Sequence, residues 1–204
     1  MEELGKIADD IYSKENTTSH HALVANYEKY KDVLDKIDYN ESQEKYDLFL
    51  QLLADYAIAL SEIESYKKAL MQIDKALDLF RNDKEFDPEK IKCIKFYELL
   101  LWNRGKSNYH LENYKEARSD FELLTKEYPE NFTYKKWLSA VKNIKRHRIK
   151  NILWYCVIIL LAIESFIVKK IIIQNTLLTA CTLCLIAVIG LEINIYYQKK
   201  KDVV

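Results

Sequence analysis

Two long apolar runs close the chain, whereas most of the chain before them has apolar residues distributed among polar ones. The runs cover residues 149–168 and 171–197, and the second is most apolar between Leu177 and Ile195. A helix of about 20 residues rises roughly 30 Å, the thickness of a membrane's hydrocarbon core. We therefore predict two transmembrane helices, 149–168 and 171–197, forming an antiparallel hairpin that is followed by a basic tail, 198–204. The alternative is a buried hairpin in a soluble core, but a domain of about 140 residues could not cover that much apolar surface.

Charge divides the chain at nearly the same place. Residues 1–141 carry 21 basic and 28 acidic side chains, whereas residues 142–204 carry 10 and 3. Five basic residues precede the first run and three follow the second, whereas only two lie between the runs. The positive-inside rule therefore predicts that both termini are cytoplasmic. The abundance of Lys, Ile, Asn and Tyr suggests a bacterial source, and hence a bacterial inner membrane. The basic residues before the first run are expected to contact lipid headgroups rather than nucleic acid: Lys142, Lys145, Arg146, Arg148 and Lys150.

Two acidic residues lie inside the runs, where carboxylates are costly to bury. Glu164 is near Lys169 in sequence, and Glu192 is near Lys199. We favour ion pairs at the membrane interface over a proton-binding site for both.

The part before the runs contains an internal repeat. Residues 64–80, ESYKKALMQIDKALDLF, align at an offset of 48 residues with residues 112–128, ENYKEARSDFELLTKEY. Matched apolar positions are three or four residues apart, so they share one helical face. Each copy is preceded by a further predicted helix, over residues 48–60 and 91–111. The matched pairs are Tyr66 and Tyr114, Ala69 and Ala117, Ile73 and Phe121, Ala76 and Leu124, and Phe80 and Tyr128.

The second copy resembles the tetratricopeptide repeat (TPR), because the signature positions of that family hold Leu101, Gly105, Tyr114, Ala117, Phe121 and Pro129. The first copy matches at Leu53, Ala57, Tyr66, Ala69, Ile73 and Ala76. The fold class that follows is all-α, a TPR-like antiparallel helical repeat array followed by two transmembrane helices. We assign two repeats to residues 48–131, N-terminal helices interpreted as a degenerate repeat to residues 1–47, and a capping and juxtamembrane helix to residues 132–148.

The resemblance implies a function in binding, since TPR arrays generally hold a peptide or partner protein in a groove lined by the first helix of each repeat. The carboxylate clamp of that family needs a Lys and Asn pair where this chain has Ala54 and Ile58, which argues against that mode. For Trp102 the alternative of a core position stays open. The expected groove residues are Gln51, Asp55 and Ile58 in the first copy and Trp102, Asn103, Lys106, Tyr109 and His110 in the second.

Motifs that carry common chemistries are missing. The sequence has no G-x-x-x-x-G-K-[ST], G-x-G-x-x-G, H-E-x-x-H or G-x-S-x-G, and only three glycines. The adjacent His20 and His21 lack a second ligand pair, as does the C-x-x-C of Cys181 and Cys184. We therefore expect no enzyme, no catalytic residues, no cofactor and no metal site.

Two functional hypotheses follow. The first is a membrane-anchored adaptor or scaffold that presents a cytoplasmic protein- or peptide-binding repeat domain. The second is a membrane effector or channel-like component, in which the hairpin oligomerises under control of the repeats. Small residues on the second run support packing against the first run or a homo-oligomer: Thr176, Ala180, Cys184, Ala187 and Gly190.

The join between the two parts contains neither Pro nor Gly from Phe132 to Val168. We therefore expect the capping helix to continue unbroken into the first transmembrane helix, as a stiff strut.

Overall fold

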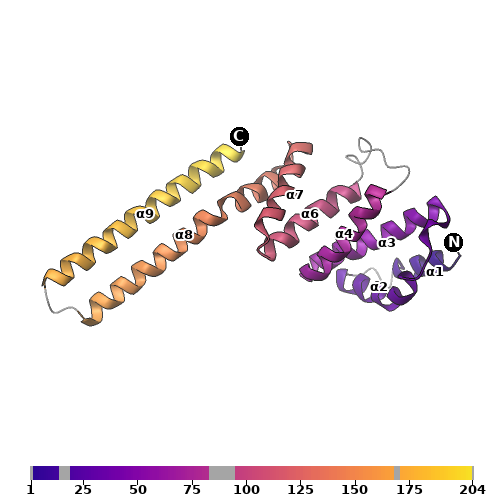
Figure 1. Cartoon of the computed structure of the whole chain (residues 1–204), viewed down its shortest axis with the longest axis horizontal. Helices are drawn as coiled ribbons and strands as arrows, with labels where there is room; N and C mark the ends of the chain where they lie inside the picture. Colours follow the sequence, from indigo (N-terminus) through magenta and orange to yellow (C-terminus); the bar gives the residue numbers. More distant parts are fainter. Residues whose placement is uncertain (1, 14–18, 83–94, 168–170, 204) are drawn as a thin grey trace. The chain divides into compact units, whose positions relative to one another are not determined.

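The computed structural model describes residues 2–13, 19–82, 95–167 and 171–203, and all the elements it describes are helical (Figure 1). The all-α prediction is therefore confirmed. The chain divides into two compact units, Met1–Pro129 and Glu130–Val204. The elements of the first unit are α1 (Glu2–Ile11), α2 (His20–Leu34), η1 (Tyr39–Glu41), α3 (Gln43–Glu62), α4 (Tyr66–Asn82), α6 (Lys95–His110) and α7 (Tyr114–Glu127).

The first unit is a stack of three helical pairs, α1 with α2, α3 with α4, and α6 with α7 (Figure 1). The first helices of successive pairs also contact one another, α1 against α3 and α3 against α6. In addition, α2 packs on α3, and α4 packs on α6. Each pair thus covers an apolar face of the next, so that no pair has to bury its core alone.

The turns within the second and third pairs have the same structure, 48 residues apart. Glu64 and Glu112 both have positive φ, 64° and 63°. The following backbone N–H bonds back to the last helical turn, Ser65 to the Leu60 carbonyl and Asn113 to the Asn108 carbonyl, each at 2.9 Å. This is the Schellman pattern, in which a left-handed residue closes a helix. The repeat seen in the sequence therefore extends to the backbone of its turns.

The crossing within the third pair is close because Gly105 has no side chain. A Cβ built on Gly105 would lie 2.9 Å from Cε1 and 3.0 Å from Cζ of Phe121. Phe121 and Ala117 are fully buried on the facing helix. Their counterparts in the second pair, Ile73 and Ala69, are also fully buried. The matched positions thus form the contacts between paired helices.

Serine side chains cap the starts of two helices, and one of these starts differs from the predicted one. Helix α3 begins at Gln43 rather than residue 48, since the Ser42 hydroxyl accepts the Lys45 N–H at 3.3 Å. Helix α2 begins at His20, where the Ser19 hydroxyl accepts the Ala22 N–H at 3.2 Å. The predicted start of the third pair, residues 91–94, lies outside the described residues.

The second unit is a hairpin of two long helices, α8 (Phe132–Ile167) and α9 (Ile171–Val203). Helix α8 has 36 residues without a break, so the expected continuous helix is present up to Ile167. Buried positions recur every seven residues on α9, at Cys181, Val188 and Ile195, and Val157 is buried on α8. Such a seven-residue spacing is typical of two helices packed along a narrow seam.

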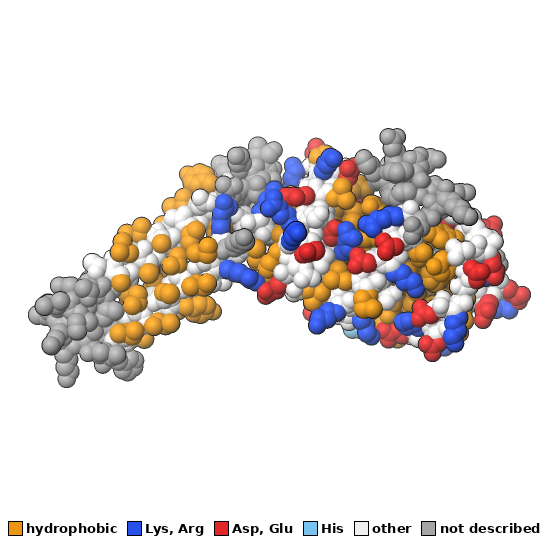
Figure 2. All heavy atoms as spheres, in the orientation of Figure 1, with side chains coloured by type: hydrophobic (Ala, Val, Ile, Leu, Met, Phe, Trp, Pro, Cys, Tyr) orange, Lys and Arg blue, Asp and Glu red, His pale blue; other side chains and the backbone are white. Residues whose placement is uncertain are grey.

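Outside this seam the hairpin exposes apolar side chains. Figure 2 shows hydrophobic atoms over much of the visible face of α8 and α9, whereas charged atoms of both signs are interspersed with hydrophobic ones over the first unit. The exposed set includes Ile152, Tyr155, Ile158, Ile159, Leu161, Leu183, Ile186 and Ile189.

Among the described residues, one segment, Thr179–Tyr197, is long and apolar enough to cross a membrane, and only 17% of its most apolar stretch is buried. A core helix of a soluble protein would be mostly buried. The predicted first span ends at Val168, outside the described residues, and stays a prediction.

Candidate functional site

One polar face of the first unit is built by the first helices of the second and third pairs. On α3, Gln51, Asp55, Ile58 and Glu62 recur at spacings of four, three and four residues, so they lie along one side of the helix. Asp55 accepts a 2.6 Å hydrogen bond from the Tyr12 hydroxyl. The Glu62 carboxylate forms an ion pair with the Lys106 ammonium of α6 at 3.0 Å. Polar contacts thus connect residues of this face to the pairs on either side.

The electrostatics of this face depend on the Asp55 carboxylate. Burial raises the pKa of Asp55, and the hydrogen bond from Tyr12 opposes that shift. Burial and the neighbouring carboxylate together raise the pKa of Tyr12 far above that of a free phenol. The pair is therefore held by one hydrogen bond, which the Tyr12 hydroxyl donates and the Asp55 carboxylate accepts.

The expected groove residues of α6 fall into two groups. Lys106 and Tyr109 are half-buried, and His110 is exposed, with its ring stacked on that of Tyr66 at 4.5 Å. Asn103, in contrast, is only 2% exposed and donates its amide to the Leu99 carbonyl at 2.8 Å. Its side chain is therefore inside the unit and does not line an open groove.

Trp102 was left open between a groove position and a core position, and it has features of both. It is half-buried, and its ring meets that of Phe121 edge-on at 5.7 Å. The indole therefore packs on the crossing of α6 and α7 and keeps part of its surface exposed.

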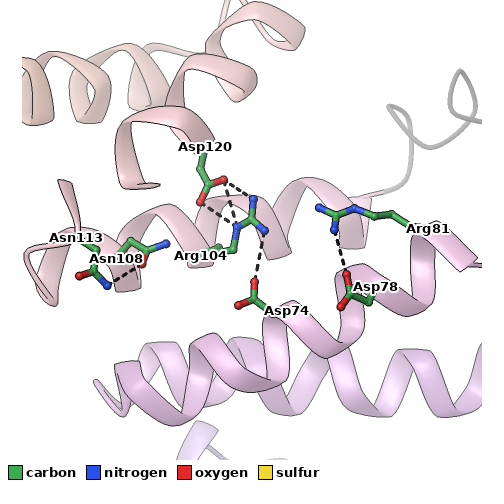
Figure 3. A network of polar contacts seen from close by, with 7 residues as sticks. All are labelled: Asp74, Asp78, Arg81, Arg104, Asn108, Asn113 and Asp120. Atoms are coloured by element: carbon green, nitrogen blue, oxygen red, sulfur yellow. Dashed lines mark hydrogen bonds and ion pairs between the residues drawn. The ribbon is translucent and has the colours of Figure 1, made fainter. Parts of the chain in front are cut away.

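An arginine network that the sequence did not predict joins α4, α6 and α7 (Figure 3). The Arg104 guanidinium donates to both carboxylate oxygens of Asp120, with a shortest distance of 2.6 Å, and to Asp74 at 3.4 Å. Burial raises the pKa of Asp120, and Arg104 opposes that shift. The network borders a cavity of about 340 Å³ with Leu70, Asn108 and Glu116. Arg104 and Asp120 are the sequence neighbours of Gly105 and Phe121, so the repeat register was the available signal.

The basic residues of the segment 142–150 all belong to α8. Lys142 and Arg148 are exposed, whereas Arg146 donates to the Asn143 side-chain oxygen at 2.6 Å. The Lys145 side chain lies outside the described set. Lys150 is partly buried, and it pairs with Glu192 of α9 at 3.1 Å.

This last contact gives Glu192 a partner on α8, and the expected pair between Glu192 and Lys199 stays a prediction. The antiparallel register of α8 and α9 brings Lys150 to Glu192 across 42 residues of sequence. The Glu164 and Lys199 side chains lie outside the described residues.

Chemistry beyond these contacts is sparse. The described residues contain no group of three or more His, Cys, Asp or Glu side chains arranged to hold a metal ion. Comparison with protein-family models gives no match to this chain, and comparison with curated proteins gives none either. The resemblance to the TPR family therefore stays a prediction.

Proposed function

We propose that this protein is a membrane-anchored scaffold, in which the α8–α9 hairpin inserts into a membrane and the helical pairs bind a protein or peptide. The observation that carries the proposal is the apolar outer surface of the hairpin, in the same chain as a polar unit of stacked helical pairs. Apolar surface of this extent is costly in water and favourable in a bilayer.

The proposed insertion has both helices spanning, with both termini cytoplasmic, in a bacterial inner membrane. Aromatic side chains support the proposed depth, because Tyr196 and Tyr197 are exposed at the end of the apolar segment of α9, and Trp154 and Tyr155 are exposed near the start of the first predicted span on α8. Trp and Tyr prefer the membrane interface. The basic residues from Lys142 to Lys150 then lie at the headgroups.

The proposed partner site is the face that α3 and α6 share. Gln51 and His110 are exposed there, and Ile58, Lys106 and Tyr109 are partly exposed, so the face offers polar, apolar and aromatic contacts together. The TPR-like signature at Gly105, Ala117 and Phe121 supports this choice, because arrays of that family bind partners on their first helices.

Site-specific photocrosslinking tests the partner face in cells that express the full chain. A photoreactive residue at Ile58 or Tyr109 should give discrete crosslinked proteins in the membrane fraction. The control is Met71, which is 70% exposed on α4, the second helix of its pair. Equal crosslinking at Met71 and at the two test positions would remove the support for this face, and recovery of the chain outside membranes would contradict the anchor.

The second candidate is an oligomerising membrane effector. It is favoured by Ala187 and Gly190, which are exposed on α9 away from the seam, and a Cβ on Gly190 would meet nothing within 4 Å. Small residues on an open face allow close packing between copies. Dye leakage from vesicles that hold the full chain, abolished by Gly190→Leu, would favour the effector over the scaffold.

A further inference from the structure

The Lys150–Glu192 pair lies at a cavity between α8 and α9, within the second unit. The cavity has a volume of about 610 Å³. Its lining combines charged and amphipathic side chains: His147, Lys150, Glu192, Ile193, Tyr196 and Tyr197. Apart from Lys150, none of these residues belongs to the expected headgroup contacts.

We propose that this cavity binds one anionic phospholipid, with its phosphate at Lys150 and His147 and its apolar part against Ile193 and the two tyrosines. The proposal deepens the function proposed above and rests on the insertion of the hairpin in a membrane. It differs from general attraction between basic residues and lipid because it assigns one lipid to one place.

The phosphate position follows from the way Lys150 is held. Its side chain is only 22% exposed, so the stem is packed in the hairpin, and its ammonium lies 3.1 Å from Glu192. An ammonium carries three N–H donors and can bond a carboxylate and a phosphate oxygen at once. His147 is one helical turn earlier on α8, and its imidazole can add a further donor. Lys142, in contrast, is exposed on the same helix.

Charge decides between an anionic and a zwitterionic headgroup. Lys150 and Glu192 balance one another at the cavity, and Arg146 and Arg148, the sequence neighbours of His147, add two positive charges close to it in sequence. The local excess is positive, which attracts a net negative headgroup and repels the ammonium of a zwitterionic one.

The apolar lining favours a lipid over a soluble phosphate compound. Ile193, Tyr196 and Tyr197 are each more than half exposed beside the cavity, at the end of the segment that can cross a membrane. An acyl chain or glycerol backbone would cover these side chains, whereas a small soluble anion would leave them in contact with water. Tyrosines in this position are typical of the membrane interface.

The test uses the full chain, purified from nanodiscs of phosphatidylcholine with a minority of phosphatidylglycerol, and native mass spectrometry to count retained lipids. The wild type should retain one phosphatidylglycerol preferentially. Lys150→Gln should weaken that retention about fivefold, and the matched control Lys142→Gln should change it by less than about twofold. Glu192→Gln should strengthen it, because the substitution removes a negative charge beside the phosphate.

Three results would overturn the proposal: equal losses in Lys150→Gln and Lys142→Gln, weaker retention in Glu192→Gln, or preferential retention of phosphatidylcholine. Far-ultraviolet circular dichroism of each variant should match the wild type, and His147→Gln serves as a second variant if Lys150→Gln does not fold. A chain that does not enter nanodiscs at all would contradict the proposed membrane anchor, whereas failure of the lysine comparison in an inserted chain contradicts the lipid site alone.

Discussion

Adding one methyl group to two different glycines should change the stability of the first unit in opposite directions. Gly105→Ala puts a Cβ at 2.9 Å from Phe121 Cε1 and 3.3 Å from the Asp120 Cβ. Gly5→Ala is the matched control, because Gly5 lies inside α1 and a Cβ there would meet nothing within 4 Å. Both sites are helical, so the intrinsic gain of Ala over Gly is the same.

The magnitudes follow from the two environments. Replacing Gly by Ala inside a helix stabilises it by roughly 0.5–1 kcal/mol, which is the full effect expected for Gly5→Ala. At Gly105 the new methyl group is well inside the usual carbon contact of about 3.5–4.0 Å. Phe121 is fully buried, so either its ring or α7 must shift against packed neighbours. Overpacking of this kind costs about 1–3 kcal/mol, and after the helical gain we expect a net loss of up to about 2.5 kcal/mol.

Urea unfolding of the full chain in detergent micelles, followed by circular dichroism and tryptophan fluorescence, measures both effects. Trp102 reports on the crossing directly, since its ring lies 5.7 Å from that of Phe121. Phe121→Leu should remove most of the penalty of Gly105→Ala in the double variant, with a coupling of about 0.5–3 kcal/mol. If Gly105→Ala stabilised the chain as Gly5→Ala does, the close crossing and the repeat register derived from it would be wrong.

Three further predictions address other parts of the first unit. Glu112→Gly should raise the free energy of unfolding by about 1 kcal/mol, because Glu112 has φ 63°; Glu116→Gly, inside α7, should lower it by a similar amount, and the opposite order would contradict the strained turn. Hydrogen bonds from Tyr30 and Lys29 lower the pKa of Asp10. The stability that these bonds give is therefore present above the ordinary pKa of an aspartate and is lost as the pH falls through the lowered pKa of Asp10. Hydrogen exchange in α1 should show that loss, and Asp10→Asn should abolish this pH dependence. A fragment of residues 1–145 should stay soluble and helical without detergent, and aggregation or a β-type circular dichroism spectrum would contradict the division of the chain.

The fold followed from the sequence where one helical face decided the structure. Ala69 and Ala117, spaced regularly from Ile73 and Phe121, indicated the two crossings, and all four side chains are fully buried. The turns were harder, because a left-handed residue normally suggests Gly. Glu64 and Glu112 occupy that conformation with no chemical signal, and only their offset of 48 residues relates them.

For the candidate site, helical spacing predicted which residues share a face of one helix, but not which residues of different helices meet. Asn103 was expected in the groove, yet its side chain is only 2% exposed, and periodicity does not specify how close two helices come. The pairs Arg104–Asp120 and Lys150–Glu192 join different helices, so they depend on tertiary register. Proximity in sequence favoured Lys199 for Glu192, whereas the antiparallel hairpin brings Lys150 to it.

The continuity of α8 leads to the last prediction, which concerns a helix that has to tolerate a run of positive charge. Lys142, Arg146 and Lys150 lie four residues apart, and like charges at this spacing each cost a helix roughly 0.2–0.5 kcal/mol. Two contacts of the structure offset that cost: Arg146 bonds Asn143, which in turn bonds the Ser139 carbonyl, and Lys150 pairs with Glu192. We therefore expect α8 to stay helical through the basic segment.

Spin labels at Lys136 and Asn151, both exposed on α8, measure this continuity in the full chain with its four native cysteines replaced by alanine. A continuous helix separates the two positions by about 22 Å along its axis, with a narrow distance distribution. Insertion of Gly-Ser after Asn143 should broaden that distribution, because the insertion interrupts the helix at its bonded asparagine and adds flexible residues. A distribution in the uninterrupted chain as broad as that of the insertion variant would mean that the basic segment is a flexible linker. The expectation of a continuous, stiff α8 would then be wrong.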